Sequence, residues 1–253
     1  MSNLLVDIGN THLRWAVDSD EGFKVGDAQL PADINPSELI EKYWFNIKPE
    51  HALISCVSSN NTVDTLLDTI DLAWKIPAKR LISPAAGGGI RNAYTEPEKL
   101  GSDRWAAMVA AYYQAQGSVC IVDCGTAMTL DAVDKDGQHL GGLIVPGIKA
   151  SQECLKQATS LKFETNITDR DLVLLGQSTQ ECIDKGSFHQ LSSLVNNTFQ
   201  HLIEQDKSMV IFLTGGSARL IQAGLSMDSI LEPDLVLKGL AIILRTKLEA
   251  SIS

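Results

Sequence analysis

The sequence predicts an α/β protein made of two similar lobes. Short runs rich in branched apolar residues alternate with longer stretches of helical periodicity, a pattern typical of mixed sheets and helices. A thirteen-residue segment near the amino terminus recurs in the middle of the chain. The length of 253 residues lies between one and two domains at about 150 residues each, and a hydrophobic share of 44% suffices for a buried core.

The expected strands are short and mostly apolar, and they lie at residues 4–8, 13–17, 52–57, 119–123, 129–133, 139–145 and 209–213. The expected helices cover residues 36–45, 62–70, 97–116, 147–157, 179–205 and 236–248. The helix at 97–116 has the strongest pattern, because Pro97 suits a first turn and five apolar residues fall near one face. These five are Leu100, Trp105, Met108, Val109 and Tyr112.

The repeat predicts a duplicated unit. VDIGNTHLRWAVD, starting at Val6, and VDCGTAMTLDAVD, starting at Val122, agree at six of thirteen positions without gaps, at an offset of 122 minus 6, or 116 residues. Both copies have the pattern of a strand ending in Asp, a turn with Gly and Thr, and a second strand. We therefore expect a boundary near Gly117, with lobes at residues 1–116 and 117–253. No Pro-rich or Ser-rich linker marks it, so we expect the lobes to share a substantial interface.

Charge and cysteine content narrow the class of function. The chain carries 21 Lys and Arg against 31 Asp and Glu, a formal charge of -10, which argues against nucleic acid as a partner. Five cysteines without a C-x-x-C pair fit neither a disulfide framework nor a zinc site. The first ten residues do not have the pattern of a signal peptide, and no segment approaches the roughly 18 apolar residues of a membrane span. We expect a cytoplasmic protein that does not bind membranes.

Each copy of the repeat has the chemistry of a phosphate-binding turn. In the first copy, Gly9 lets a phosphate approach backbone N–H groups, Thr11 adds a hydroxyl donor, and the Asp7 carboxylate suits a hydrated Mg²⁺ ion. An ordinary Asp–Gly hairpin turn would have the same residues. The second copy, with Asp123 and Thr126, favours two turns that hold one ATP molecule from both sides.

A third glycine-rich turn, Phe-Leu-Thr-Gly-Gly at residues 212–216, follows an apolar strand. Such a turn can receive a ribose or a base close to the backbone. A strand-to-helix turn also requires glycine for steric reasons alone, so both interpretations stay open.

Four further motifs point to one family. They are GIRNAY at residues 89–94, LGSDRW at 100–105, GGLIVPG at 141–147 and DLVLKGL at 234–240. Together with the three turns they resemble the type III pantothenate kinases, which belong to the actin, hexokinase and Hsp70 superfamily, and the resemblance runs essentially from end to end. It implies an actin-like ATPase fold of two ribonuclease-H-like lobes with a cleft between them. It also implies ATP-dependent phosphorylation of pantothenate to 4′-phosphopantothenate, the first step of coenzyme A synthesis.

The resemblance implies roles for single residues in the substrate site. Asp103 matches the family's proposed base, and a carboxylate within reach of a primary hydroxyl can accept its proton. Arg104 matches an anchor for the pantothenate carboxylate, since guanidinium pairs with carboxylate at two points. Each of three residues also has a purely structural interpretation. Asp103 can be an acidic residue that stabilises the start of a helix, and Arg104 can form a surface ion pair. Thr179 can cap a helix. The implied substrate-binding residues are Tyr94, Gly101, Ser102, Asp103, Arg104 and Thr179.

The implied nucleotide and cation sites follow the two hairpins. Asp123 is implied as a ligand of a monovalent cation, potassium or ammonium, and Mg²⁺ accompanies ATP. The chain departs mildly from the commoner family pattern at Met128, His12 and Arg14, and no implied ligand is lost. The implied ATP-binding residues are Asp7, Ile8, Gly9, Asn10, Thr11, His12, Leu13, Arg14 and Thr126.

The resemblance further implies a homodimer whose interface helps to form the pantothenate pocket. Two alternatives stay open: a non-catalytic regulatory or accessory protein on the same scaffold, and a kinase of another small hydroxy acid or sugar. The presence of Asp7, Asp103, Arg104, Asp123 and Thr126 favours the enzyme. Only Tyr94 and residues 101–104 indicate pantothenate as the acceptor.

Overall fold

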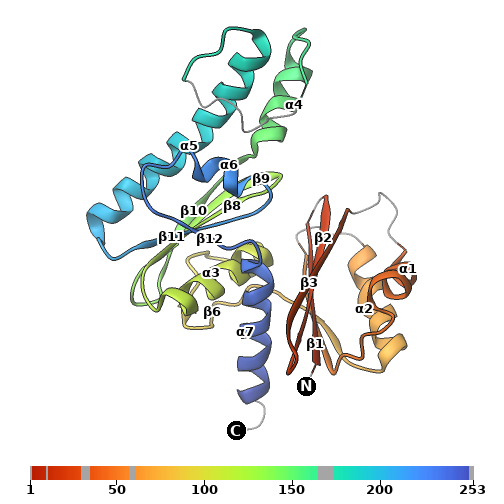
Figure 1. Cartoon of the computed structure of the whole chain (residues 1–253). Coiled ribbons are helices and arrows are strands. Elements are labelled where there is room, and N and C mark those ends of the chain that lie inside the picture. Colours follow the sequence, from red (N-terminus) through yellow and green to blue (C-terminus); the bar gives the residue numbers. More distant parts are fainter. Residues whose placement is uncertain (1, 10, 30–34, 57–60, 165–173, 251–253) are drawn as a thin grey trace. The chain divides into compact units, whose positions relative to one another are not determined.

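The structure is a computed structural model, and it describes residues 2–9, 11–29, 35–56, 61–164 and 174–250. Contacts within the chain divide it into two compact units, Met1–Tyr113 with Asp234–Ser253, and Gln114–Pro233. Each unit contains one five-stranded mixed sheet with helices (Figure 1). In the described part of the chain, no helix combines the length and the apolar character that crossing a bilayer requires.

The first unit has a sheet in the order β3-β2-β1-β4-β5. Strands β3, β2 and β1 pair antiparallel, and strands β1, β4 and β5 pair parallel. Helix α1 (Pro36–Leu39), the π-helical turn Ile40–Trp44 and α2 (Asn61–Trp74) cover one face, where alternate side chains of β1 join their apolar cluster (Figure 1). Helix α7 (Leu235–Ala250) lies on the other face, and α3 (Ser102–Ala115) packs beside α7. The strands are β1 (Ser2–Ile8), β2 (His12–Ser19), β3 (Gly22–Gln29), β4 (His51–Cys56) and β5 (Ala78–Arg80).

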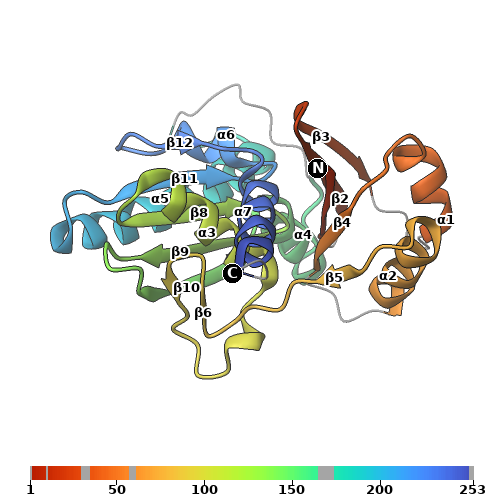
Figure 2. The same ribbon diagram turned by 90° about the horizontal axis from the view of Figure 1, so that it is seen from below.

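The second unit repeats this topology, with a sheet in the order β10-β9-β8-β11-β12 (Figure 2). Its strands have the same directions, because β8, β9 and β10 are antiparallel and β8, β11 and β12 are parallel. The matching topologies confirm the predicted α/β class with two similar lobes. The strands are β8 (Val119–Cys124), β9 (Ala127–Val133), β10 (His139–Pro146), β11 (Val210–Thr214) and β12 (Ile230–Leu231), and the helices are α4 (Ile148–Ala158), α5 (Thr179–Gln205) and α6 (Ala218–Gln222).

The two copies of the repeat differ by one residue in the turn. Asp7 pairs with Arg14, seven positions later, whereas Asp123 pairs with Thr129, six positions later. The ungapped alignment therefore matches Arg14 with Leu130, although Thr129 occupies the equivalent place in the sheet. Because side chains alternate between the two faces of a strand, this shift moves every later residue to the opposite face. The topology supports the duplication, but the sequence matches after the turn are not equivalent positions.

The expected single helix at 97–116 is wrong. Pro97–Lys99 forms one 3-10 turn, and Leu100 is extended with ψ 132°. Helix α3 begins only at Ser102, so Asp103 lies in its first turn and not in its second. The apolar periodicity of residues 105–112 is correct, but it does not show where the backbone leaves the helical conformation. The segment between β5 and this turn also forms a small ribbon of β6 (Ala86–Gly87) and β7 (Ile90–Arg91).

Strand β3 has no counterpart among the expected strands. Its sequence, GFKVGDAQ, contains three polar residues and two glycines, so the apolar alternation of a half-buried strand does not extend beyond Val25. Glycine is required at position 26 for steric reasons, because a Cβ atom there would lie 2.3 Å from the ring of Trp15 on β2. The strand depends on its neighbour more than on its own composition.

The C-terminal helix packs with the first unit. Helix α7 contacts β1, β2 and β4. A Cβ atom at Gly239 would lie 1.9 Å from the carbonyl oxygen of Ala106 in α3, so the two helices touch through their backbones. Arg245 of α7 also donates from Nε to Asp18 of β2 at 3.0 Å. The expected boundaries, 1–116 and 117–253, grouped residues 234–253 with the second lobe, because linear order does not tell which sheet a terminal helix covers.

Candidate active site

The first hairpin places Asp7 at the centre of a row of polar residues. In the sheet register, Arg14 of β2 and Ser55 of β4 are the Cα partners of Asp7 on either side. Val6 and Ile8 pack into the apolar cluster under α1 and α2, so Asp7 is directed to the opposite face. Partner residues on adjacent strands share a face, and the three polar side chains therefore line up on it.

The turn between β1 and β2 is closed by a hydrogen bond from the Gly9 N–H to the His12 carbonyl oxygen, at 3.0 Å. Thr11 and His12 are exposed, and His12 Nδ1 lies 3.1 Å from Thr11 Oγ1. Ile8 and Leu13 are only 5% and 1% exposed, so their side chains belong to the core and only backbone groups remain for a ligand. Asn10, the remaining residue of this turn, lies outside the described residues.

Arg14 is held by an acidic residue that is distant in the sequence. Its Nη2 donates to Asp234 Oδ1 at 2.5 Å, and the two side chains are 31% and 29% exposed. Asp234 precedes α7, and its carbonyl oxygen accepts from the Lys238 N–H at 2.9 Å. The carboxylate therefore orients a guanidinium next to Asp7. Asp234 is not among the expected site residues, although the motif DLVLKGL begins with it.

The amino end of α3 presents Asp103. The Gly101 carbonyl oxygen accepts from the Trp105 N–H at 3.0 Å, which closes the first turn. Asp103 is half-buried, and its Oδ1 accepts from the Arg104 N–H at 2.8 Å. A Cβ atom at Gly101 would lie 2.5 Å from Asp103 Oδ1, so glycine leaves space for this carboxylate orientation.

Ser102 connects this helix end to the sheet. It is 6% exposed, and its Oγ accepts from the Cys56 N–H at 3.2 Å. The Ser102 Oγ also lies 3.1 Å from the Oγ of Ser55, which is fully buried. The Ser102 side chain is therefore occupied by contacts with β4. Ser55 is not among the expected site residues, and the only signal for it is a serine directly after the apolar run of residues 52–54.

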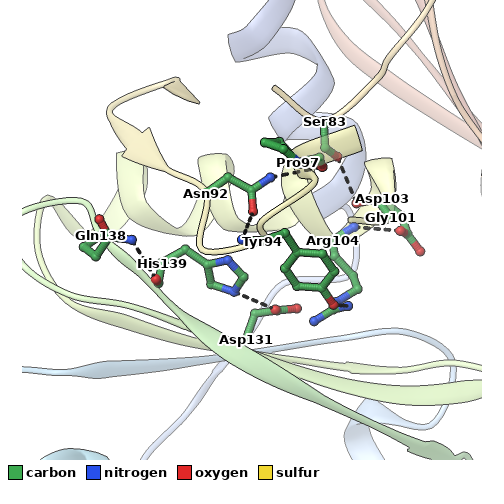
Figure 3. Close-up of polar contacts among 10 residues, drawn as sticks. All are labelled: Ser83, Asn92, Tyr94, Pro97, Gly101, Asp103, Arg104, Asp131, Gln138 and His139. Carbon is green, nitrogen blue, oxygen red and sulfur yellow. Dashed lines mark hydrogen bonds and ion pairs between the residues drawn. The ribbon is translucent and has the colours of Figure 1, made fainter. Parts of the chain in front are cut away.

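Arg104 is buried and held by Tyr94 (Figure 3). It is 7% exposed, its Nη1 donates to the Tyr94 hydroxyl at 2.9 Å, and its guanidinium carbon lies 5.8 Å from the ring centroid. The Tyr94 N–H donates to Asn92 Oδ1 at 3.0 Å. Asn92 Nδ2 donates in turn to the carbonyl oxygens of Pro84 and Pro97, both at 3.2 Å. The burial of Arg104 rules out the alternative of a surface ion pair.

In the second unit, two glycines of later turns enclose the second hairpin. Gly147 donates its N–H to the Thr126 carbonyl oxygen at 2.9 Å, and a Cβ atom there would lie 2.3 Å from the Gly125 carbonyl oxygen. A Cβ atom at Gly215 would lie 2.4 Å from Asp123 Oδ1. The steric interpretation of the third turn therefore holds for Gly215. Carboxylate and carbonyl oxygens are donors of the kind that hard cations prefer.

Two buried cysteines of β8, the strand that carries Asp123, take no part in chemistry. Burial, and next the Asp131 carboxylate, raise the pKa of Cys120 to about 12. Burial, and next Asp123, raise the pKa of Cys124 even further. Both thiols stay protonated at neutral pH, so neither is a nucleophile. Asp131 itself lies 3.0 Å from Nε2 of His139 in a buried pair that links β9 and β10 (Figure 3).

Thr179 begins α5 with an exposed side chain. Ser178 caps this helix, because its Oγ accepts from the Glu181 N–H at 3.2 Å. Capping therefore does not explain Thr179. The structure places Thr179 in the second unit, whereas it brings Tyr94 and residues 101–104 together in the first.

The chain is similar in sequence to known proteins of one family. A model of the family described as type III pantothenate kinase matches residues 3–201. A type III pantothenate kinase of Marinobacter nauticus is 33% identical over 241 residues, which cover 94% of this chain and 96% of that protein. One of Nitrosococcus oceani is 33% identical over 246 residues, covering 94% and 92%.

Solved structures bear on the fold. A conserved protein of Campylobacter jejuni assigned to the Baf family of transcriptional activators is similar with a TM-score of 0.61 at 20% identity, over 97% of this chain and 99% of that chain. A ROK family glucokinase of Streptomyces griseus, solved with glucose and AMPPNP, has a TM-score of 0.55 at 11% identity, over 97% and 100%. At these identities the likeness shows the fold alone. Because the family model spans more than half of the sequence and these curated relatives align with more than nine tenths of it, the chain belongs to the type III pantothenate kinase family.

Proposed function

We propose that this protein transfers the γ-phosphoryl group of ATP to the primary hydroxyl of pantothenate, forming 4′-phosphopantothenate and ADP in the first step of coenzyme A synthesis. Membership of the family supports the reaction. The observation that carries the assignment of residues is the amino end of α3, where Asp103 lies beside the buried Arg104 and its partner Tyr94.

Asp103 is the proposed general base. The hydroxyl oxygen of pantothenate forms a bond to the γ-phosphorus, the bond from that phosphorus to the bridging oxygen of ADP breaks, and the hydroxyl proton passes to the Asp103 carboxylate. Arg104 pairs with the pantothenate carboxylate, and the Tyr94 hydroxyl holds its guanidinium in place. Gly101, Ser102 and Thr179 complete the proposed acceptor site.

The phosphates of ATP lie in the proposed site against the hairpin of residues 7–14, with Thr126 as a second contact. Backbone N–H groups near Gly9 and the Arg14 guanidinium supply positive charge. The half-buried Asp7 carboxylate gives oxygen donors of the kind that a hydrated Mg²⁺ ion prefers. When bound with ATP, Mg²⁺ neutralises phosphate charge.

Asp123 is the proposed ligand of a monovalent cation, potassium or ammonium. The support is that Gly215 and Gly125 closely approach Asp123 Oδ1, whereas Gly147 closely approaches the carbonyl oxygens of residues 125 and 126. We also propose a homodimer in the cytoplasm. The resemblance to the family supports a dimer whose interface helps to form the pantothenate pocket, so monomers obtained by dilution or by a charged interface variant should be poor catalysts.

The test measures ADP formation by the purified protein with ATP, Mg²⁺ and pantothenate, in potassium or in sodium, with the product identified by mass. Asp103→Asn should abolish most of the turnover because it removes the proton acceptor. Asp68→Asn is the matched control, since Asp68 is an exposed aspartate on α2, across the sheet. Turnover of a different hydroxy acid or sugar in an acceptor panel would change the substrate. A folded dimer without any turnover would favour the regulatory alternative.

A further inference from the structure

The side chain of Ser55 is a buried polar group that the proposed chemistry does not use. Ser55 is 0% exposed on β4, between Ile54 and Cys56, which are 0% and 4% exposed. A buried hydroxyl stabilises a fold only if it is hydrogen-bonded, and alanine would satisfy an apolar strand without that requirement. The presence of serine here therefore calls for a partner.

That partner is Ser102, whose Oγ lies 3.1 Å from the Oγ of Ser55. Ser102 Oγ also accepts from the Cys56 N–H at 3.2 Å and donates to the Cys56 carbonyl oxygen at 3.5 Å, so three groups of β4 hold one hydroxyl. We call the contact between Ser55 and Ser102 the serine bridge. It joins the end of β4 to the residue directly before Asp103.

The serine bridge also reaches the phosphate side of the site. Ser55 is the Cα partner of Asp7 in the parallel register of β4 and β1. On its other side, the segment before Asp103 is held by Ser83, which is 2% exposed and donates from Oγ to the Gly101 carbonyl oxygen at 3.4 Å (Figure 3). The carboxylate of Asp103 thus follows a turn that is fixed from the sheet and from the loop after β5.

We propose that Ser55 is a positioning residue of the kinase reaction, which acts through the serine bridge to hold Asp103 in the orientation that accepts the hydroxyl proton. This role rests on the proposed function. Misplacement of a catalytic group by about 1 Å can cost about a hundredfold in rate, so a hydroxyl that touches no substrate can control the rate. The role predicts a loss in kcat, whereas the substrates continue to bind.

The experiment compares Ser55→Ala with Ser55→Thr, which keeps the hydroxyl. We expect Ser55→Ala to lower kcat about tenfold or more, with KM for ATP and pantothenate within about threefold, and Ser55→Thr to restore most of kcat. Ser192→Ala is the matched control, because Ser192 is 2% exposed and donates to the Phe188 carbonyl oxygen at 2.9 Å within α5 of the second unit. The Ser192→Ala variant should unfold at a lower temperature than the wild type and keep its kcat.

A double-mutant cycle separates positioning from general destabilisation. The single-turnover rate constant is measured at high enzyme concentration in an Asp103→Asn background. There, Ser55→Ala should lower this rate constant less than about twofold, because the group that Ser55 positions is already absent. Additive losses, or a folded Ser55→Ala variant with the kcat of the wild type, would overturn the role of Ser55 while leaving the proposed function intact. A wild-type protein without pantothenate-dependent turnover would instead overturn the proposed function, and the role of Ser55 with it.

Discussion

Tyr94→Phe removes one oxygen atom from the proposed pantothenate site and changes little else. The Tyr94 hydroxyl accepts from Arg104 Nη1 at 2.9 Å, and the guanidinium carbon lies 5.8 Å from the ring centroid. Phenylalanine keeps the ring contact and loses the hydrogen bond. Because Arg104 is only 7% exposed, water has little access to replace the lost acceptor.

A hydrogen bond to a charged group contributes about 1.5–3 kcal/mol, equivalent to a factor of about 10 to 150 in affinity. The ring of Phe still limits the motion of Arg104, so we expect the lower end, a rise in KM for pantothenate of about tenfold. The kcat value should stay within about twofold, because Tyr94 supports the substrate anchor Arg104, whereas the proposed proton acceptor is Asp103.

The assay is ADP formation at varied pantothenate and saturating ATP. Tyr113→Phe is the matched control, because Tyr113 lies at the end of the same helix as Arg104 and is 66% exposed. The reasoning fails if Tyr94→Phe leaves KM for pantothenate unchanged within twofold, or if kcat falls while KM does not, since Arg104 would then not depend on Tyr94 to bind the substrate.

Three further predictions test packing, pH dependence and the cation site. Gly239→Ala should lower the unfolding temperature, because its Cβ would lie 1.9 Å from the Ala106 carbonyl oxygen and overpacking costs about 1–3 kcal/mol; an unchanged melting curve would contradict the close approach of α7 and α3. Hydrogen bonding, chiefly from the Ser118 hydroxyl, lowers the pKa of Asp206 from 3.8 to about 2, so its stabilising contribution is complete above about pH 4 and is lost as the pH falls toward 2. Asp206→Asn should therefore flatten the decline of the unfolding temperature between pH 4 and pH 2, and a decline as steep as that of the wild type would exclude this group as its source. Asp123→Asn should reduce turnover in potassium to the level that the wild type has in sodium, and undiminished stimulation by potassium would place the cation elsewhere.

Much of the fold follows from local patterns. The apolar runs and the repeat beginning at Val6 and Val122 predict two similar α/β lobes, and both sheets have the same strand order. The details of the repeat were misleading, because one residue fewer in the second turn shifts every later position to the other face. Strand β3 could not be predicted from its own residues. Glycine disfavours strands, and Gly26 is required here only because the ring of Trp15 on the neighbouring strand leaves no space for a Cβ atom.

In the candidate site, too, some features are predictable from the sequence and others depend on the folded structure. The sequence motifs single out Asp7, Asp103 and Arg104, because each chemical role requires a particular residue type within a short motif. The burial of Arg104 against Tyr94 could not be read from the motif, since a guanidinium in a first helical turn is equally compatible with solvent. The assignment of the helix cap to Ser178 likewise depended on backbone geometry.

Periodicity and short motifs are local properties of a chain, and they predict the class of this protein, the order of most of its longer elements and the residue types that carry the proposed chemistry. Which distant residues support that chemistry depends on how the chain folds in three dimensions. Asp234 meets Arg14 across 220 positions of sequence, and Ser55 meets Ser102 across 47. Such contacts arise from strand register and from helices packing on a sheet, and a buried polar group finds its partner only after the chain has folded.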